Sequence, residues 1–197
     1  MTSDRAWTAE HVLSSLRRAA GRSVLAILLV VGAGVTGASA AATIDAFFGS
    51  YEGKSISANG EGLSKRDLGV EISSLDRGFR LAWTTVKHRA DGSAQRKSYT
   101  IDFRATRRAG VYASAMRTTK FGSRVPLDPM KGEPFVWARL HGQTLTVYAL
   151  HIDDNGVYEM QVYDRTLTDA GLDLEFNRYR DGEKLRTISG SLVRTAR

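Results

Sequence analysis

From Thr43 onward, hydrophobic and polar residues alternate along the chain with a period of two, which is the pattern of strands with one buried face. The clearest alternating stretches are 68–72, 79–83, 99–103, 135–140, 145–150, 158–162 and 172–176. We find no convincing stretch with the 3.6-residue period of a helix after residue 42. The pattern therefore predicts an all-β protein from residue 43 to residue 197.

Glycine-containing turn signals, such as Asn155-Gly156 and Asp181-Gly182, separate these stretches. Asn-Gly and Asp-Gly favour tight hairpins because hairpin turns need residues that tolerate positive φ. Short turns between about ten strands predict an antiparallel up-and-down meander. Closure removes the exposed edges of such a sheet, so we expect a barrel of about 8–10 strands. A two-sheet sandwich is the alternative, although it usually needs longer crossovers.

One connection, residues 117–134, is much longer than the others. It holds all three prolines of the chain, Pro126, Pro129 and Pro134. Proline is disfavoured in central strands, so we expect a long loop here. Such loops are often lids or binding loops, and the alternative is a surface insertion without a role in binding.

The N-terminal segment carries an apolar run over 23–35, preceded by three arginines and followed by small residues. This order predicts a secretory signal peptide over 1–42, forming an apolar signal helix and cleaved after Ala40 or Ala42. The alternative is an uncleaved membrane anchor, although a spanning helix needs about 20 apolar residues. Either interpretation predicts export, so we expect a periplasmic or secreted protein that contacts the membrane only if this segment is retained.

Composition narrows the chemistry. The 197 residues include 28 basic and 21 acidic ones, a net charge of +7. Residues 1–42 hold four of the basic and two of the acidic residues, so the remainder carries +5. This charge is either ordinary surface solubility or a preference for anionic envelope lipids or lipopolysaccharide. Nucleic acid is not an expected partner. The absence of cysteine excludes disulfides, thiolate metal sites and cysteine nucleophiles.

The first predicted strand region reads Phe-Phe-Gly-Ser-Tyr-Glu-Gly over 47–53. A Gly-x-aromatic step that opens a β-meander resembles the lipocalin-like (calycin-type) barrels, in which Gly-x-Trp opens the first strand. Here Tyr51 stands in the place of the tryptophan. The resemblance implies a central cavity for a small apolar ligand. It also implies a basic residue late in the chain that packs on the aromatic ring, and Arg178 and Arg194 are both candidates.

Sequence motifs for catalysis and cofactor binding are not found. The chain contains no Gly-x-Ser-x-Gly elbow, no P-loop and no His-Glu-x-x-His, so no catalytic residue is assigned. Ten-strand barrels of the nitrobindin type bind haem through a proximal histidine. Here His88, His141 and His151 all precede the last predicted strands. We therefore expect no metal site and no cofactor.

The barrel interior is the best candidate for function, although the sequence leaves open which alternating set points inward. Tyr163 and Phe176 are among the aromatic residues considered. The predicted ligand-binding residues are Tyr51, Trp83, Tyr99, Phe103, Trp137 and Tyr148.

The predicted function is a non-catalytic exported β-barrel that binds a small hydrophobic or amphipathic molecule or acts as an envelope interaction module. One alternative is a barrel enzyme, a hydrolase or isomerase, that uses an interior carboxylate such as Asp102 or Glu159. The other alternative is a purely structural envelope protein.

Overall fold

The computed structural model describes residues 42–59, 62–89 and 91–196. The predicted signal peptide and its helix, apart from Ala42, lie outside the described residues. Within the described part of the chain, no helix is long and apolar enough to cross a membrane.

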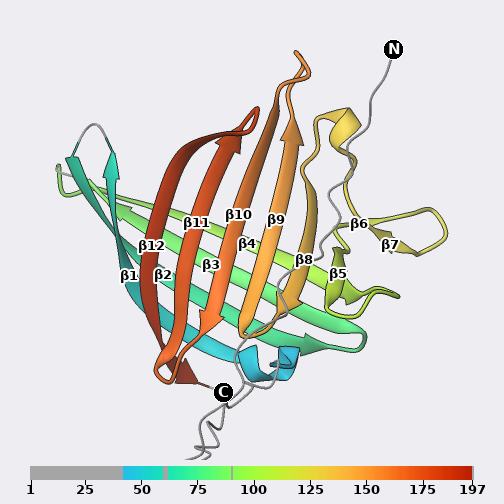
Figure 1. The fold of residues 1–197 in the computed structure, drawn as a ribbon, viewed down its shortest axis with the longest axis horizontal. Coiled ribbons are helices and arrows are strands. Elements are labelled where there is room, and N and C mark those ends of the chain that lie inside the picture. The colour runs from blue at the N-terminus through green and yellow to red at the C-terminus, as the bar shows by residue number, and fades with distance from the viewer. Residues whose placement is uncertain (1–41, 60–61, 90, 197) are drawn as a thin grey trace, which may run out of the picture. The chain divides into compact units, whose positions relative to one another are not determined.

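Ten antiparallel strands form a closed barrel, with β12 paired to β1 (Figure 1). Each strand pairs with its neighbours along the chain, except that β5 pairs with β8 across an insertion. This confirms the predicted all-β up-and-down meander and its closure. The barrel strands are β1 (Gly49–Asn59), β2 (Gly62–Leu75), β3 (Gly78–His88), β4 (Ala94–Ala105), β5 (Val111–Ser114), β8 (Phe135–His141), β9 (Thr144–Ile152), β10 (Tyr158–Leu167), β11 (Gly171–Arg180) and β12 (Glu183–Ala196).

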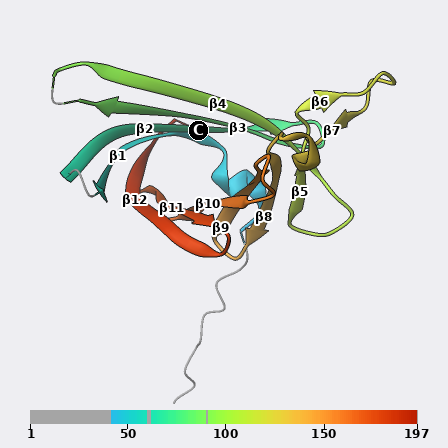
Figure 2. The ribbon, with the colours of Figure 1, turned by 90° about the horizontal axis from the view of Figure 1, so that it is seen from above.

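The tight turns follow the glycine signals of the sequence. Between β11 and β12, Asp181 and Gly182 both have positive φ, at 47° and 83°. A type I′ hairpin turn needs this conformation at both central residues, which explains the Asp-Gly pair. Seen from above, β1–β4 run along one side of the interior and β8–β12 curve around the other (Figure 2).

One end of the barrel interior is filled by apolar side chains. Phe79 and Phe103 are fully buried and stack with ring centroids 4.9 Å apart. The short 3-10 helix η1 (Ile44–Phe47) precedes β1 and adds the buried ring of Phe47 to this core. Interior pairs such as Leu140↔Leu145 and Leu167↔Leu172 continue the packing around the barrel. Interdigitated side chains of this kind give the closed sheet its main stabilisation.

The end of β12 is fastened to η1 by Arg194. Its guanidinium lies 4.9 Å from the ring centroid of Tyr51, and it donates hydrogen bonds to the carbonyl oxygens of Ala46 (2.7 Å) and Phe48 (3.0 Å). Of the two candidates for a basic residue packed on Tyr51, the structure therefore places Arg194 there. Arg178 instead pairs with a carboxylate of β10.

The long connection over 117–134 is not irregular throughout. It contains a small two-stranded sheet of β6 (Arg117–Thr118) and β7 (Arg124–Val125), followed by the 3-10 helix η2 (Pro129–Lys131). The sequence pattern predicted only a loop here. The strands are two residues each, which is too short for a period-2 pattern to be recognised.

Candidate functional site

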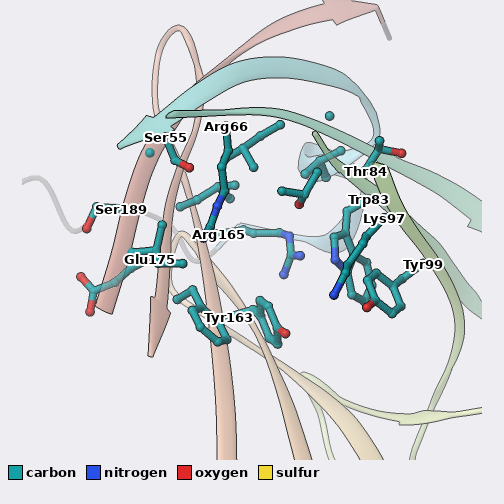
Figure 3. A pocket seen from close by; sticks show the side chains of 18 of the residues that line it. Ser55, Arg66, Trp83, Thr84, Lys97, Tyr99, Tyr163, Arg165, Glu175 and Ser189 are labelled. Atoms are coloured by element: carbon teal, nitrogen blue, oxygen red, sulfur yellow. The ribbon is translucent and has the colours of Figure 1, made fainter. Parts of the chain in front are cut away.

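A cavity of about 420 Å³ lies inside the barrel, beyond the apolar core (Figure 3). Its lining residues come from β1–β4 and β10–β12. Sites for small molecules in proteins have volumes of roughly 300–1,000 Å³. One part of the barrel is therefore filled by its own side chains, and another part is open enough for a ligand.

Aromatic rings form one wall of the cavity. Trp83 and Tyr99 come from neighbouring positions of β3 and β4 and stack at 5.1 Å between centroids. Tyr163 lies 6.0 Å from Trp83, and Phe176 lies 4.7 Å from Tyr163. Burial raises the pKa of Tyr163 to about 12, so its hydroxyl remains protonated at neutral pH. The wall offers a continuous apolar surface with phenol hydroxyls attached.

Arg165 of β10 lines the same cavity and is almost completely buried, with 3% of its surface exposed. Its guanidinium carbon lies 5.8 Å from the ring centroid of Trp83 and 5.9 Å from that of Tyr163. Among the described residues, its Nε and Nη1 atoms have no hydrogen-bond partner. Desolvation lowers its pKa to about 10, so the side chain is still charged at neutral pH. Figure 3 shows the guanidinium within the ring of lining side chains.

Ser55 of β1 is a second polar lining residue with unused hydrogen-bonding capacity. It is 2% exposed, and its Oγ finds no partner within the described part of the chain. Buried polar groups in proteins are normally hydrogen-bonded. The unpaired buried atoms of Ser55 and Arg165 in one cavity indicate a place where a bound molecule supplies the missing partners.

The electrostatic character of the cavity is positive. Two acidic residues, Asp164 and Glu175, also contribute to its lining. They are paired positions of β10 and β11, next to the inward-facing pair Tyr163 and Phe176, so their side chains point to the outer face of the barrel. Asp164 accepts a hydrogen bond from Thr146 there. Besides Arg165, four basic residues line the cavity: Arg66, Lys87, Lys97 and Arg186. Desolvation and the neighbouring Arg186 charge lower the pKa of Arg66.

Glu159, one of the two carboxylates considered for catalysis, is held in a chain of hydrogen bonds on β10 and β11. Arg178 donates to its Oε2 at 2.5 Å, and Gln161 donates to its Oε1 at 2.7 Å. The Tyr163 hydroxyl in turn donates to Gln161. The bond from Arg178 lowers the pKa of Glu159. The carboxylate is therefore ionised and paired, and it does not line the cavity.

Asp102, the other carboxylate considered, lies outside the barrel interior. It occupies the position between the inward-facing Ile101 and Phe103, and it binds Arg80 through Nε (2.7 Å) and Nη2 (3.0 Å). Arg124 of the long connection donates to the same carboxylate at 3.0 Å. The hydrogen bond from Arg80 lowers the pKa of Asp102. Asp102 thus fastens the β6–β7 hairpin to the barrel, and no residue of 117–134 lines the cavity.

The six predicted ligand-binding residues separate into three places. Trp83 and Tyr99 line the cavity. Tyr51 and Phe103 are buried in the apolar core. Trp137 and Tyr148 face the outside, where they pair across β8 and β9 and stack at 4.8 Å. Their role in ligand binding stays a prediction, which the cavity geometry supports for the first two alone.

The register of β8 explains the outward position of Trp137. Val136 and Ala138 are buried inside, so the residue between them must face away. Both faces of this strand are apolar in sequence, and period-2 alternation alone could not choose between them. No histidine lines the interior cavity among the described residues.

The sequence pattern did not indicate Arg165 or Ser55 as cavity residues. The inward face of β10 carries Glu159, Gln161, Tyr163 and Arg165, whereas the outward face carries apolar residues such as Val162. This reverses the usual rule that the apolar side of a strand points inward. The aromatic Tyr163 two positions before Arg165 was the available signal, since both residues share one face.

No protein-family model matches the chain, and no curated protein is similar to it. Among solved structures, it is similar to the S-type phycobiliprotein lyase from Guillardia theta, with a TM-score of 0.30 and 10% identity over 77% of this chain and 89% of that chain. A likeness at this level carries no conclusion about function. Fold and site together define a closed antiparallel β-barrel with an interior cavity.

Proposed function

We propose that this protein binds one small amphipathic molecule inside the barrel, without catalysing a reaction. The observation that carries the proposal is the interior cavity of about 420 Å³, which combines an aromatic wall with buried polar atoms that have no partner in the described protein. A ligand with an apolar body would cover the wall, and its polar group would complete the unmade hydrogen bonds.

The properties of Asp102 and Glu159, the two carboxylates considered as catalytic groups, favour a binding protein over an enzyme. A general acid that works near neutral pH needs a raised pKa. Ion pairing instead lowers the pKa of both Asp102 and Glu159. Neither residue lines the cavity, so neither is positioned to act on a molecule bound there.

The packing of Arg194 on Tyr51 supports a distant relationship to the lipocalin-like barrels. The sequence resemblance implied a basic residue of the last strands on this ring, and Arg194 of β12 occupies that position. We infer that the chain shares the barrel architecture of those proteins, with ten strands in place of eight.

The binding experiment uses N-phenyl-1-naphthylamine, a neutral probe that fluoresces in apolar sites. Thr85 lines the cavity, and Thr85→Trp fills space there. We expect this substitution to weaken probe binding at least tenfold. The matched control is Val193→Trp, which places the same indole at an exposed position of β12. Equal binding by wild type and Thr85→Trp, or no binding by the wild type, would contradict the proposed function.

We also propose that the protein is exported, on the strength of the basic, apolar and small-residue order over 1–42. Mass spectrometry of the protein from its own source should find an N-terminus near Ala41 or Thr43. Membrane-bound protein that retains Met1 would contradict cleavage and favour the anchor.

A further inference from the structure

We propose that the bound molecule is an amphipathic carboxylate, whose head group pairs with Arg165 while its apolar body lies along Trp83 and Tyr163. This inference rests on the proposed function and names the class of ligand. It follows from the unpaired charge of Arg165, from the aromatic rings that flank its guanidinium, and from the other basic residues that line the cavity.

The buried charge of Arg165 has no ion-pair partner among the described residues, although the more distant Asp164 charge favours it. Within the described part of the chain, no carboxylate lies within ion-pair distance of its guanidinium, and two of its nitrogen atoms make no hydrogen bond. An unpaired buried charge is strongly destabilising. The rings of Trp83 and Tyr163 offset part of this cost, but they do not supply an acceptor for Nε and Nη1.

Other arginines of the same barrel have hydrogen-bond acceptors within the protein. Arg80 pairs with Asp102, Arg178 pairs with Glu159, and Arg194 donates to two carbonyl oxygens. Each of these side chains has an acceptor within the fold, although Nε of Arg178 makes no hydrogen bond to the described residues. Since Arg165 is more deeply buried than any of them, its missing acceptor is best explained by a molecule from outside.

A carboxylate suits this place better than a bulkier anion. The guanidinium is planar and presents parallel N–H groups that match the two oxygens of a carboxylate. The flanking rings of Trp83 and Tyr163, both within 6 Å of the guanidinium carbon, favour a flat head group over a tetrahedral one. The phenol and indole faces then continue into the wall that would hold the apolar body.

The remaining basic residues would guide such a ligand inward. Arg66, Lys87, Lys97 and Arg186 line the cavity, so an approaching anion meets a positive potential before it reaches Arg165. Burial, and after it the nearby positive charge of Arg186, lowers the pKa of Arg66. An anion between the two arginines would reduce their repulsion.

The test compares decanoate with decan-1-ol, which share a chain length and differ in the charge of the head group. Both compete with N-phenyl-1-naphthylamine for the wild-type protein at pH 8. We expect decanoate to bind at least tenfold more tightly. In Arg165→Met, which keeps an apolar side chain in place, decanoate should lose at least tenfold in affinity. The affinities of decan-1-ol and the neutral probe should change less than threefold.

Three further measurements make the outcomes distinct. Thermal unfolding verifies that Arg165→Met folds, and removing an unpaired buried charge should leave its melting temperature unchanged or higher. Arg165→Lys, which keeps the charge but not the planar fork, should bind decanoate with intermediate affinity. Arg66→Met should reduce the association rate and its dependence on salt more than it reduces final affinity.

Four outcomes would contradict the carboxylate assignment or the proposed function. If the neutral probe binds but decanoate and decan-1-ol compete equally, the inference is wrong and the proposed function stands. If Arg165→Met weakens all three compounds alike, Arg165 serves only to shape the cavity. If decyl phosphate binds more tightly than decanoate, the head group is a phosphate and the assignment to a carboxylate is wrong. If the wild type binds no compound, the proposed function itself fails.

Discussion

Replacing Arg194 with methionine tests how the 3-10 helix η1 is attached to the barrel. The substitution removes the cation above the Tyr51 ring and the two hydrogen bonds from the guanidinium to Ala46 and Phe48. Methionine keeps most of the apolar stem, so the packing of the side chain changes little. The 3-10 helix η1 would then keep its apolar contact through Phe47 but lose its polar attachment to β12.

The expected cost follows from the individual contacts. A hydrogen bond from a charged donor contributes about 1.5–3 kcal/mol when buried, and a cation–π contact contributes about 0.5–1 kcal/mol at an exposed site. One of the two hydrogen bonds of Arg194 is exposed and the other is partly buried, so solvent weakens both. We therefore expect Arg194→Met to lower the free energy of unfolding by roughly 2–3 kcal/mol.

Urea unfolding followed by far-ultraviolet circular dichroism measures this change. The control is Arg139→Met, which removes an exposed arginine from the outer face of β8 and should change the free energy of unfolding by less than about 0.5 kcal/mol. A double-mutant cycle with Tyr51→Leu isolates the coupling between ring and cation. A loss below about 0.5 kcal/mol for Arg194→Met would refute the view that this residue fastens η1 to the barrel.

Three other perturbations separate core, outer surface and cavity. Phe103→Ala should lower the free energy of unfolding in urea by about 3–5 kcal/mol, because it empties a fully buried position. The ion pairs of Asp102 should stabilise the fold fully above about pH 4 and lose this effect as the pH falls through its lowered pKa, so Asp102→Asn should flatten that part of the acid-unfolding curve. Trp83→Ala should weaken binding of N-phenyl-1-naphthylamine in fluorescence titrations, whereas Trp137→Ala should leave it unchanged.

The sequence determined the elements and their order. Period-2 alternation identified the strands because side chains of a strand point to opposite faces, and Asp-Gly or Asn-Gly pairs marked hairpins because of their tolerance of positive φ. Short turns between neighbouring strands implied an antiparallel meander, and unpaired edges implied closure. These are local signals, and each depends on only a few consecutive residues.

Tertiary structure decided which face of each strand is inside. For β8 both faces are apolar, and only pairing with β5 and β9 sends Val136 and Ala138 inward and Trp137 outward. For β10 the inward face is the polar one, which brings Arg165 into the interior. These choices depend on register with strands far away in sequence, so no local pattern contains them.

The cavity itself is also a property of the closed sheet. Ten strands set the circumference, and side chains from both halves of the chain either fill the interior, as Phe79 and Phe103 do, or leave it open beside Trp83 and Arg165. The sequence by itself determined a β-barrel, but it did not determine which of its aromatic residues face the interior. Only the closed structure decided that a buried arginine lies among those rings with two nitrogen atoms that find no acceptor in the described part of the chain, because that juxtaposition joins β3 to β10 across the interior.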